Sequence, residues 1–260
     1  MRRFWPRLAS QPPGPVTQGA YDRLARFYDW SGAADFSDAC LTATRDALAR
    51  LAHAPRNCLD IACGTGTFVI EMERQGLAAV GIDRSHAMLQ EARAKAHKLH
   101  SRPLLVCADM RDFTLRARFD LVTCFYDALN HVTDAAGAAA AIGNAARHLA
   151  PGGIYLFDTN NERMFERVWS GPRETIDVGT GLVEIDYRYD PVRGSAAAQV
   201  TFRRRGEAPI SGWVHERCHP RAEIEDALGR AGLELVCRDP HPYFRGSDAS
   251  LKDLWLCRKP

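Results

Sequence analysis

Two glycines and one carboxylate stand at the spacing of a loop that binds a nucleoside-containing ligand. Gly64 and Gly66 come directly after the apolar segment 57–62, and Asp83 ends the next apolar segment. Glycine has no Cβ, so the chain can turn sharply there and a ligand can lie against its backbone. A carboxylate about twenty residues after such glycines can accept both hydroxyl hydrogens of a ribose. The combination predicts a cofactor-binding loop, whereas the glycines without Asp83 would equally fit an ordinary strand-to-helix turn.

The position three residues after the second glycine separates two classes of cofactor. Enzymes that bind a nicotinamide dinucleotide carry a third glycine there, which lets the pyrophosphate approach closely. In this sequence the position is Val69. A nicotinamide-dependent oxidoreductase that uses Gly64, Gly66 and Asp83 is therefore the less favoured alternative.

Short apolar segments alternate with segments of helical periodicity from residue 57 onward, which is typical of a parallel sheet with helices on both faces. Strands are expected near 57–62, 78–82, 104–107, 121–125, 154–158, 233–237 and 254–257. Helices are expected near 67–75, 86–100 and 134–149, and a further helix begins near residue 220. Apolar and charged side chains alternate over 183–190, and 199–203 and 213–217 are expected as antiparallel neighbours of that strand. The predicted fold is α/β, a Rossmann-like seven-stranded doubly wound sheet with a β-rich insertion after strand five.

The same pattern predicts four parts of the chain. Residues 1–20, with three arginines and several prolines, are expected to form a disordered arm, and an organelle-targeting peptide is less favoured. Residues 21–159 are expected to hold an N-terminal helix lid and the cofactor-binding core. An antiparallel β insertion that covers the substrate is expected over 160–218, followed at 219–260 by the last helix and the closing strands.

Four segments, taken in order, resemble the motifs of class I S-adenosylmethionine-dependent methyltransferases. Asp60-x-x-Cys63-Gly64-Thr65-Gly66 is similar to their first motif. Gly81-Ile82-Asp83-Arg84-Ser85, followed by Met88-Leu89, resembles the second. Ala108-Asp109-Met110 resembles the segment in which an aspartate accepts from the adenine amino group, and Leu149 to Thr159 resembles the entry to strand five. The resemblance covers nearly all of residues 21–258.

The resemblance implies S-adenosylmethionine as the cofactor, held by residues from the N-terminal helix and from the ends of four strands. These residues are Tyr21, Asp60, Ala62, Cys63, Gly64, Gly66, Asp83, Arg84, Met88, Asp109, Met110, Cys124 and Phe125. In one bacterial branch of the family, the tyrosine that matches Tyr21 reaches over the methionine end of the cofactor. Tyr21, Leu24, Ala25 and Tyr28 also share one helical face, so packing as an amphipathic lid is an equal alternative.

The acceptor side is expected at the end of strand four, in the segment 124–131 (CFYDALNH). It resembles the corresponding segment of small-molecule N-methyltransferases, including sugar amine, glycine and sarcosine types, so methylation of nitrogen is favoured over oxygen. His131 is the nearest plausible proton acceptor at neutral pH, and packing at the start of the next helix is the alternative. Tyr126 and Asn130 are predicted to orient the acceptor, and Asp127 to pair with its amine or to serve as a turn residue.

The insertion offers further candidates for contact with the acceptor. His215, Glu216 and Arg217 resemble a strand of the same bacterial branch and are lid candidates, and Tyr187 or Trp213 could supply an apolar wall. An ordinary sheet surface is the favoured explanation of the same alternation.

Composition excludes several classes of function. The net charge of +2 over 260 residues, and a single basic cluster at 203–205 without interleaved aromatic residues, argue against nucleic acid. No apolar segment is long enough for a membrane span, so a cytoplasmic protein is expected. No Cys-x-x-Cys occurs and a zinc site from Cys218, His215 and His219 is disfavoured, so no metal is expected. The expected partner is a small-molecule methyl acceptor. A homodimer and a non-catalytic module that only binds S-adenosylmethionine both stay open.

Overall fold

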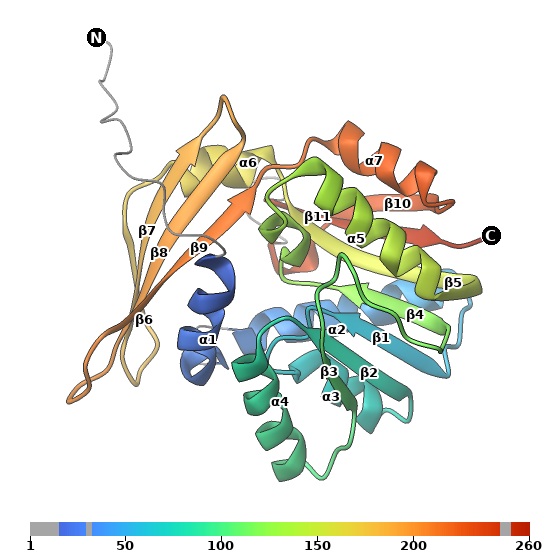
Figure 1. The fold of residues 1–260 in the computed structure, drawn as a ribbon, viewed down its shortest axis with the longest axis horizontal. Coiled ribbons are helices and arrows are strands. Elements are labelled where there is room, and N and C mark those ends of the chain that lie inside the picture. Colours follow the sequence, from blue (N-terminus) through green and yellow to red (C-terminus); the bar gives the residue numbers. More distant parts are fainter. Residues whose placement is uncertain (1–15, 30–32, 245–250) are drawn as a thin grey trace.

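The computed structural model describes residues 16–29, 33–244 and 251–260, which build two sheets and the helices around them (Figure 1). The larger sheet has seven strands in the order β10-β11-β5-β4-β1-β2-β3. Their bounds are β1 (Asn57–Ile61), β2 (Ala78–Asp83), β3 (Leu104–Cys107), β4 (Phe119–Cys124), β5 (Leu149–Asn160), β10 (Glu234–Pro240) and β11 (Lys252–Arg258). β1 to β5 pair in parallel, and β11 is antiparallel to both of its neighbours. The predicted fold class is confirmed.

Apolar side chains on both faces of the central strands explain why helices cover the sheet on both sides. In β4, Val122 packs with α5 (Ala135–His148) and α7 (Arg221–Arg230), whereas the adjacent Leu121 packs with helices on the other face. Those helices are α2 (Ala33–Arg50), α3 (Thr67–Arg74) and α4 (His86–Lys98). Strands buried on both faces read as continuous apolar runs, which is why the sequence revealed them clearly.

Helix α2 was not anticipated from the sequence. Its apolar positions Phe36, Cys40 and Ala47 are buried and lie on one face of the helix. The helix carries charged and small polar residues between those positions, so its apolar stripe is narrow. Packing against the sheet, rather than a strong sequence pattern, stabilises this helix.

The insertion forms a separate four-stranded antiparallel sheet with the order β6-β7-β8-β9. Its strands are β6 (Glu174–Asp177), β7 (Leu182–Asp190), β8 (Ser195–Arg203) and β9 (Ile210–Arg217), and α6 (Glu162–Met164) and the π-helical turn η3 (Phe165–Trp169) precede them. One face of this sheet packs on helix α1 (Val16–Tyr28), where Leu24 and Phe27 contact Val183 and Phe202. In Figure 1, α1 lies between the four-stranded sheet and α4, beside the large sheet. The short turn η4 (Pro242–Phe244) precedes β11.

The predicted arm 1–20 needs a correction at its end. Residues 1–15 lie outside the described residues, but helix α1 begins at Val16. Ala20 is buried, and a Cβ at Gly212 would lie 3.0 Å from the Ala20 Cβ. Close packing of the helix on β9 at this glycine therefore stabilises a helical turn that the local sequence did not predict. Among the described residues, no helix combines the length and the apolarity that crossing a membrane would need.

Candidate functional site

A cavity of about 510 Å³ lies at the carboxyl ends of the parallel strands, closed over by α1 and by strands β8 and β9. This volume falls in the range of about 300–1,000 Å³ typical of small-molecule sites. The predicted residues that line it are Tyr21, Ala62, Gly64, Asp83, Arg84, Met88, Asp109, Met110, Phe125, Tyr126 and His131. Asp60 and Cys63 line a smaller adjoining cavity of about 40 Å³, which shares Ala62 and Gly64 with the large one.

The loop after β1 and the end of β2 form one hydrogen-bonded unit around Asp83. Its carboxylate accepts the backbone N–H of Gly64 at 2.9 Å and the backbone N–H of Ser85 at 2.8 Å, through different oxygens. Burial raises the pKa of Asp83, and these two hydrogen bonds oppose that shift. Gly64 has φ +53° and open space where a Cβ would be. A carboxylate has about four lone-pair positions, so Asp83 keeps acceptors for two more hydrogen-bond donors.

Gly66 has a different role from the predicted contact with the cofactor. It lines neither cavity, and a Cβ at this position would lie 2.9 Å from the Ala92 Cβ in α4. With φ +77°, it also adopts a backbone conformation that favours glycine. The second glycine of the loop therefore allows helix α4 to pack closely, which is a structural role.

Asp109 lies on the cavity wall, paired with a residue that the sequence did not single out. Arg111 donates to it from Nε at 2.9 Å and from a terminal nitrogen at 2.7 Å. The Arg111 hydrogen bond holds the pKa of the Asp109 carboxyl below its usual value, although burial opposes this. Asp109 is thus an ionised acceptor, and its Oδ2 keeps a lone pair for a further donor.

Helix α1 is fastened to the cofactor loop by its own acidic side chains. Asp22 accepts a hydrogen bond from the Ser85 hydroxyl. Asp29 accepts from the Thr65 hydroxyl at 2.6 Å and pairs with Lys95 at 2.7 Å. The helix therefore closes the cavity over the loop and keeps Tyr21 inside it.

The chain after β4 turns through two consecutive left-handed residues, Tyr126 at φ +62° and Asp127 at φ +49°. The backbone N–H of Asp127 donates to Asp158, which helps to hold the turn. The Tyr126 hydroxyl is hydrogen-bonded to Ser37 at 2.5 Å. Tyr126 therefore forms part of the cavity wall with its hydroxyl held by Ser37, and its role in orienting an acceptor stays a prediction.

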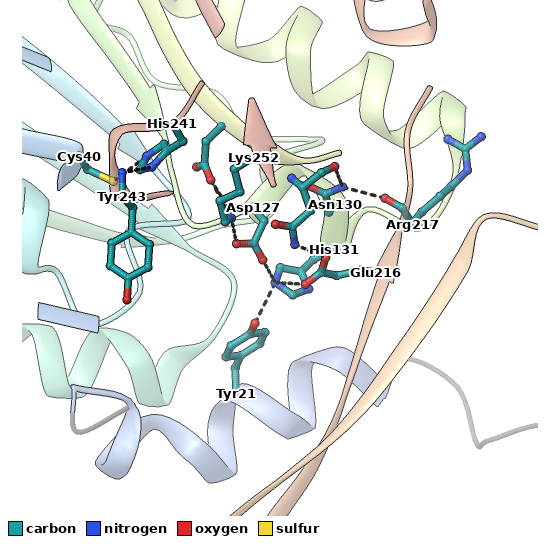
Figure 2. A network of polar contacts seen from close by, with 12 residues as sticks. Tyr21, Cys40, Asp127, Asn130, His131, Glu216, Arg217, His241, Tyr243 and Lys252 are labelled. Carbon is teal, nitrogen blue, oxygen red and sulfur yellow. Dashed lines mark hydrogen bonds and ion pairs between the residues drawn. The ribbon is translucent and has the colours of Figure 1, made fainter. Parts of the chain in front are cut away.

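The short helix η2 (Ala128–His131) ends on His131, which lies inside the cavity (Figure 2). Its Nδ1 is 3.1 Å from the His215 carbonyl oxygen. A carbonyl only accepts, so Nδ1 carries the hydrogen and Nε2 carries a lone pair. That lone pair accepts the Tyr21 hydroxyl at 2.9 Å. Burial lowers the pKa of His131, so the side chain is a neutral base at neutral pH.

Two predicted site residues are corrected by their contacts. Asn130 is fully buried outside both cavities, donating to the carbonyls of Asn160 and Arg217 at 3.2 and 2.9 Å and accepting from the Asn160 N–H at 2.9 Å. It joins η2 to β5 and β9 and has no oxygen or nitrogen left for an acceptor. Cys124 is also buried, with its side chain in the core on the α5 side of the sheet. The next residue, Phe125, lines the cavity in its place.

A buried charged cluster next to His131 is the main feature that the sequence did not reveal (Figure 2). Asp127 and Glu216 carry carboxylate oxygens 3.8 and 3.9 Å from His131 Nε2. Lys252, the first residue of β11, forms ion pairs with Asp127 and with Asp158, the latter at 2.9 Å. The sequence offered Glu216 only as one of several lid candidates. In an alternating strand, the residue type alone does not tell which face of the strand packs against the rest of the protein.

The same cluster is where metal-ligating atoms gather within the described ranges. One ligand atom each from Asp127, His131 and Glu216 lies within 4.8 Å of the other two. The ammonium of Lys252 already pairs with Asp127, and the Tyr21 hydroxyl already occupies the lone pair of His131. A divalent cation would have to displace the Lys252 ammonium and the Tyr21 hydroxyl. In this structure the positive charge beside Asp127 comes from Lys252.

Comparisons with known proteins agree with this arrangement. Residues 58–153 match the family model described as a methyltransferase domain. Over 216 residues the chain is 32% identical to dTDP-3-amino-3,6-dideoxy-alpha-D-glucopyranose N,N-dimethyltransferase of Streptomyces fradiae, covering 75% of this chain and 77% of that protein. It is 31% identical to putative methyltransferase YqeM of Bacillus subtilis, covering 68% of this chain and 73% of that protein.

Solved structures share the fold at lower identity. An S-adenosylmethionine-dependent methyltransferase from Clostridium acetobutylicum matches with a TM-score of 0.77 and 21% identity, covering 92% of this chain and 98% of that one. The amino pentose methyltransferase CalS10 from Micromonospora echinaspora, solved with S-adenosylmethionine bound, matches with a TM-score of 0.68 and 22% identity, covering 90% and 94%.

Proposed function

The chain belongs to the class I S-adenosylmethionine-dependent methyltransferases, and we propose that it methylates an amine nitrogen of a small molecule held between the two sheets. The observation that supports nitrogen best is the neutral His131, whose Nε2 lone pair faces the cavity. An amine arrives at neutral pH as an ammonium ion and must lose a proton before it can attack. Three relatives at 32, 29 and 31% identity are N,N-dimethyltransferases of dTDP-linked amino sugars.

The cavity residues fit the cofactor of this family. Asp83 has free lone pairs for the two ribose hydroxyls, and Gly64 leaves open space beside it. Asp109, with the neighbouring Met110, suits the adenine, and the adjoining cavity beside Asp60 suits the amino-acid end. Burial raises the pKa of Asp60 to about 7. When bound, S-adenosylmethionine supplies a methyl group on a positively charged sulfur that leaves as a neutral thioether.

The residues around His131 can take up the proton that the ammonium of the acceptor must lose. The ammonium of the acceptor gives one proton to the Tyr21 hydroxyl oxygen while that hydroxyl passes its own hydrogen to Nε2, which leaves the amine lone pair free to form the new bond to carbon. The His215 carbonyl holds the imidazole by its Nδ1–H throughout, so the ring stays in the tautomer that can accept. Tyr21 and Tyr126 line the cavity from opposite elements and, with α1, exclude water from the reacting atoms.

This proposal therefore gives fewer residues a direct role in the reaction than the sequence predicted. His131 is the proton acceptor, and Tyr21 covers it. Asn130 fixes the surrounding backbone. Tyr126 forms the wall. The proposed acceptor class is a small-molecule amine.

Binding of the product cofactor tests the first half of the proposal. Isothermal titration with S-adenosylhomocysteine should show binding at micromolar concentration. Asp83→Ala should weaken that binding at least tenfold, or about 1.4 kcal/mol, because both ribose hydrogen bonds are lost. Gly143→Ala, in α5 and away from the cavity, is the matched control. Equal affinity of Asp83→Ala and the parent chain would contradict the placement of the cofactor.

The acceptor atom is tested with matched nitrogen and oxygen substrates. We expect transfer of a labelled methyl group to dTDP-3-amino-3,6-dideoxy-α-D-glucopyranose, the acceptor of the Streptomyces fradiae relative, or to smaller amines of a metabolite extract. The analogue with a hydroxyl in place of the amino group should not be methylated. Methylation of hydroxyl compounds alone would overturn the choice of nitrogen.

A further inference from the structure

The buried cluster beside His131 contains three carboxyl groups and one lysine, which is an unusual composition for the interior of a sheet. Asp127, Asp158, Glu216 and Lys252 each expose less than a third of their side chains, and Asp158 is fully buried. Buried charges persist only where partners compensate the loss of water. The arrangement of protons and charges in this cluster is therefore set by its geometry.

Lys252 makes its contacts with the two aspartates. Its Nζ pairs with Asp127 Oδ1 and lies 2.9 Å from Asp158 Oδ2 (Figure 2). It also lies 5.1 Å over the ring of Phe36, which closes the cluster on the α2 side. The backbone fixes this position, because Lys252 pairs in register with Asn160 at the end of β5.

The carboxyl groups of Asp127 and Glu216 come together beside His131, where one oxygen of each lies within 4.8 Å of the other and of a ring nitrogen. Like charges this close disfavour the ionisation of both carboxyl groups. Burial and the neighbouring Asp127 raise the pKa of Glu216 well above its usual value. Burial also raises the pKa of Asp127, but the ion pair with Lys252 and the contact with His131 outweigh it and lower the pKa. Asp127 is therefore the carboxyl group that stays ionised.

We infer that Lys252 is a positioning residue for methyl transfer: through its ion pair it keeps Asp127 ionised beside His131, so that the imidazolium formed when His131 takes a proton is stabilised. This inference rests on the proposed function, in which His131 is the proton acceptor. Lys252 does not line the cavity and acts through Asp127. The ion pair therefore opposes the effect of burial, which lowers the pKa of His131.

Charged and titratable groups face this cluster from every side. They are Tyr21 from α1, Arg84 after β2, Asp127 before η2, Asp158 from β5, His215 and Glu216 from β9, and Lys252 from β11. Asp127 raises the pKa of His131, whereas Lys252 and Arg84 lower it, Asp127 having the larger effect of the three. Removal of Lys252 therefore has two opposite consequences. The direct repulsion is lost, but the buried Asp127 without its cation takes up a proton and no longer stabilises the imidazolium.

The pKa of His131, measured by NMR titration of labelled histidine side chains, separates these consequences. This readout does not depend on methyl transfer, so it stays informative even if the acceptor is not an amine. In Lys252→Met we expect the pKa of His131 to fall by about one unit, which is the lower end of the effect of an opposite charge within about 4–6 Å. In Asp127→Asn we expect a fall of the same direction. Lys259→Met, one residue beyond the far end of β11, should leave the pKa of His131 unchanged.

A double-mutant cycle decides whether Lys252 acts through Asp127. In the Asp127→Asn background, adding Lys252→Met should not lower the pKa of His131 further. Without Asp127, the only effect of Lys252 on His131 is the repulsion between two positive charges, and its loss does not lower the pKa. The double variant leaves one buried carboxyl group, that of Asp158, without its cation, whereas Lys252→Met leaves two, so the double variant is expected to fold even if Lys252→Met alone does not. A further fall in the double variant, or an unchanged or raised pKa in Lys252→Met, would overturn the inference. With an amine acceptor, the acidic limb of the kcat/KM profile should shift in parallel.

Discussion

Replacement of His131 by glutamine removes the basic lone pair while it keeps an N–H that can reach the His215 carbonyl. The effect of this substitution on activity depends on pH through two protonation equilibria, that of His131 and that of the amine acceptor. Burial lowers the pKa of His131 below the unperturbed value of about 6.5, so at pH 7.4 roughly nine-tenths or more of the side chain is neutral and ready to accept. An unperturbed primary amine, with a pKa of about 10.4, is free only to roughly one part in a thousand at that pH.

Without the base, the enzyme can use only the free amine. A positioned general base contributes about 10²–10⁴-fold, so we expect kcat/KM of His131→Gln to be roughly a thousandfold lower at pH 7.4, equivalent to about 4 kcal/mol. At about pH 10.4 half of the amine is free, so the loss should shrink to roughly twofold. In the parent enzyme, a lowered pKa of the base means that activity falls only as the pH drops below about 6.5.

The assay is transfer of a labelled methyl group to one amine acceptor, measured from about pH 6 to 10.4 on the parent and on two variants. His148→Gln is the matched control, since His148 is also buried and accepts the Leu115 N–H, but packs on Phe113 away from the cavity. It should lower stability and leave the pH profile unchanged. If the ratio of parent to His131→Gln activity were the same at every pH, His131 would not be the proton acceptor.

Three further changes test other parts of the structure. Asn130→Leu removes the side-chain partner of the Asn160 N–H and of two carbonyls in the interior. The free energy of unfolding in urea should therefore fall by about 3 kcal/mol. A fall below about 0.5 kcal/mol would refute the role of Asn130 in joining η2 to β5 and β9. Asp29→Asn breaks the ion pair with Lys95 that holds α1 against α4. S-adenosylhomocysteine should then dissociate about two- to fivefold faster in stopped flow, without a change in Tm. An unchanged dissociation rate would contradict the role of this ion pair in keeping α1 over the cavity. Burial lowers the pKa of His148, so the unfolded chain binds more protons at this residue as the pH falls through about 6.5, and its contribution to stability decreases there. Buried carboxyl groups such as Asp60, whose pKa is raised to about 7, act in the opposite direction, so the measurement is the difference in unfolding free energy between the parent and His148→Gln. That difference should shrink between about pH 7 and 5, and a constant difference would disagree.

The sequence predicted the large sheet because its signal is local. Strands buried on both faces read as apolar runs, and Gly64 and Asp83 follow two of them at the positions where a parallel sheet brings its carboxyl ends together. The alternation over 183–190 likewise predicted β7, because one face of that strand packs on α1 and the other is open. Helix α2 was missed because its packing partners lie far along the chain.

The polar part of the site was harder to predict, because contacts over long sequence distances decide what a polar residue does. Asn130 and His131 are neighbours of similar polarity, yet Asn130 is fixed between β5 and β9 whereas His131 faces the cavity. Lys252 gave no signal in the sequence, since a single lysine before an apolar strand is usually a surface residue. Its meaning comes from Asp127, which is 125 residues away.

In the proposed function, the insertion is part of the proton-accepting site and does more than cover it. Strand β9 supplies the carbonyl that fixes the tautomer of His131 and the carboxyl group of Glu216. Successive residues of a strand face opposite sides, so a shift of β9 by one residue would turn Glu216 out of the cavity. Asn130 prevents such a shift, because it accepts from β5 and donates to the carbonyl of Arg217 at the end of β9. The turns at the far end of the insertion, by contrast, line neither cavity and carry none of these contacts, so substitutions there should leave the base and its charged neighbours in place.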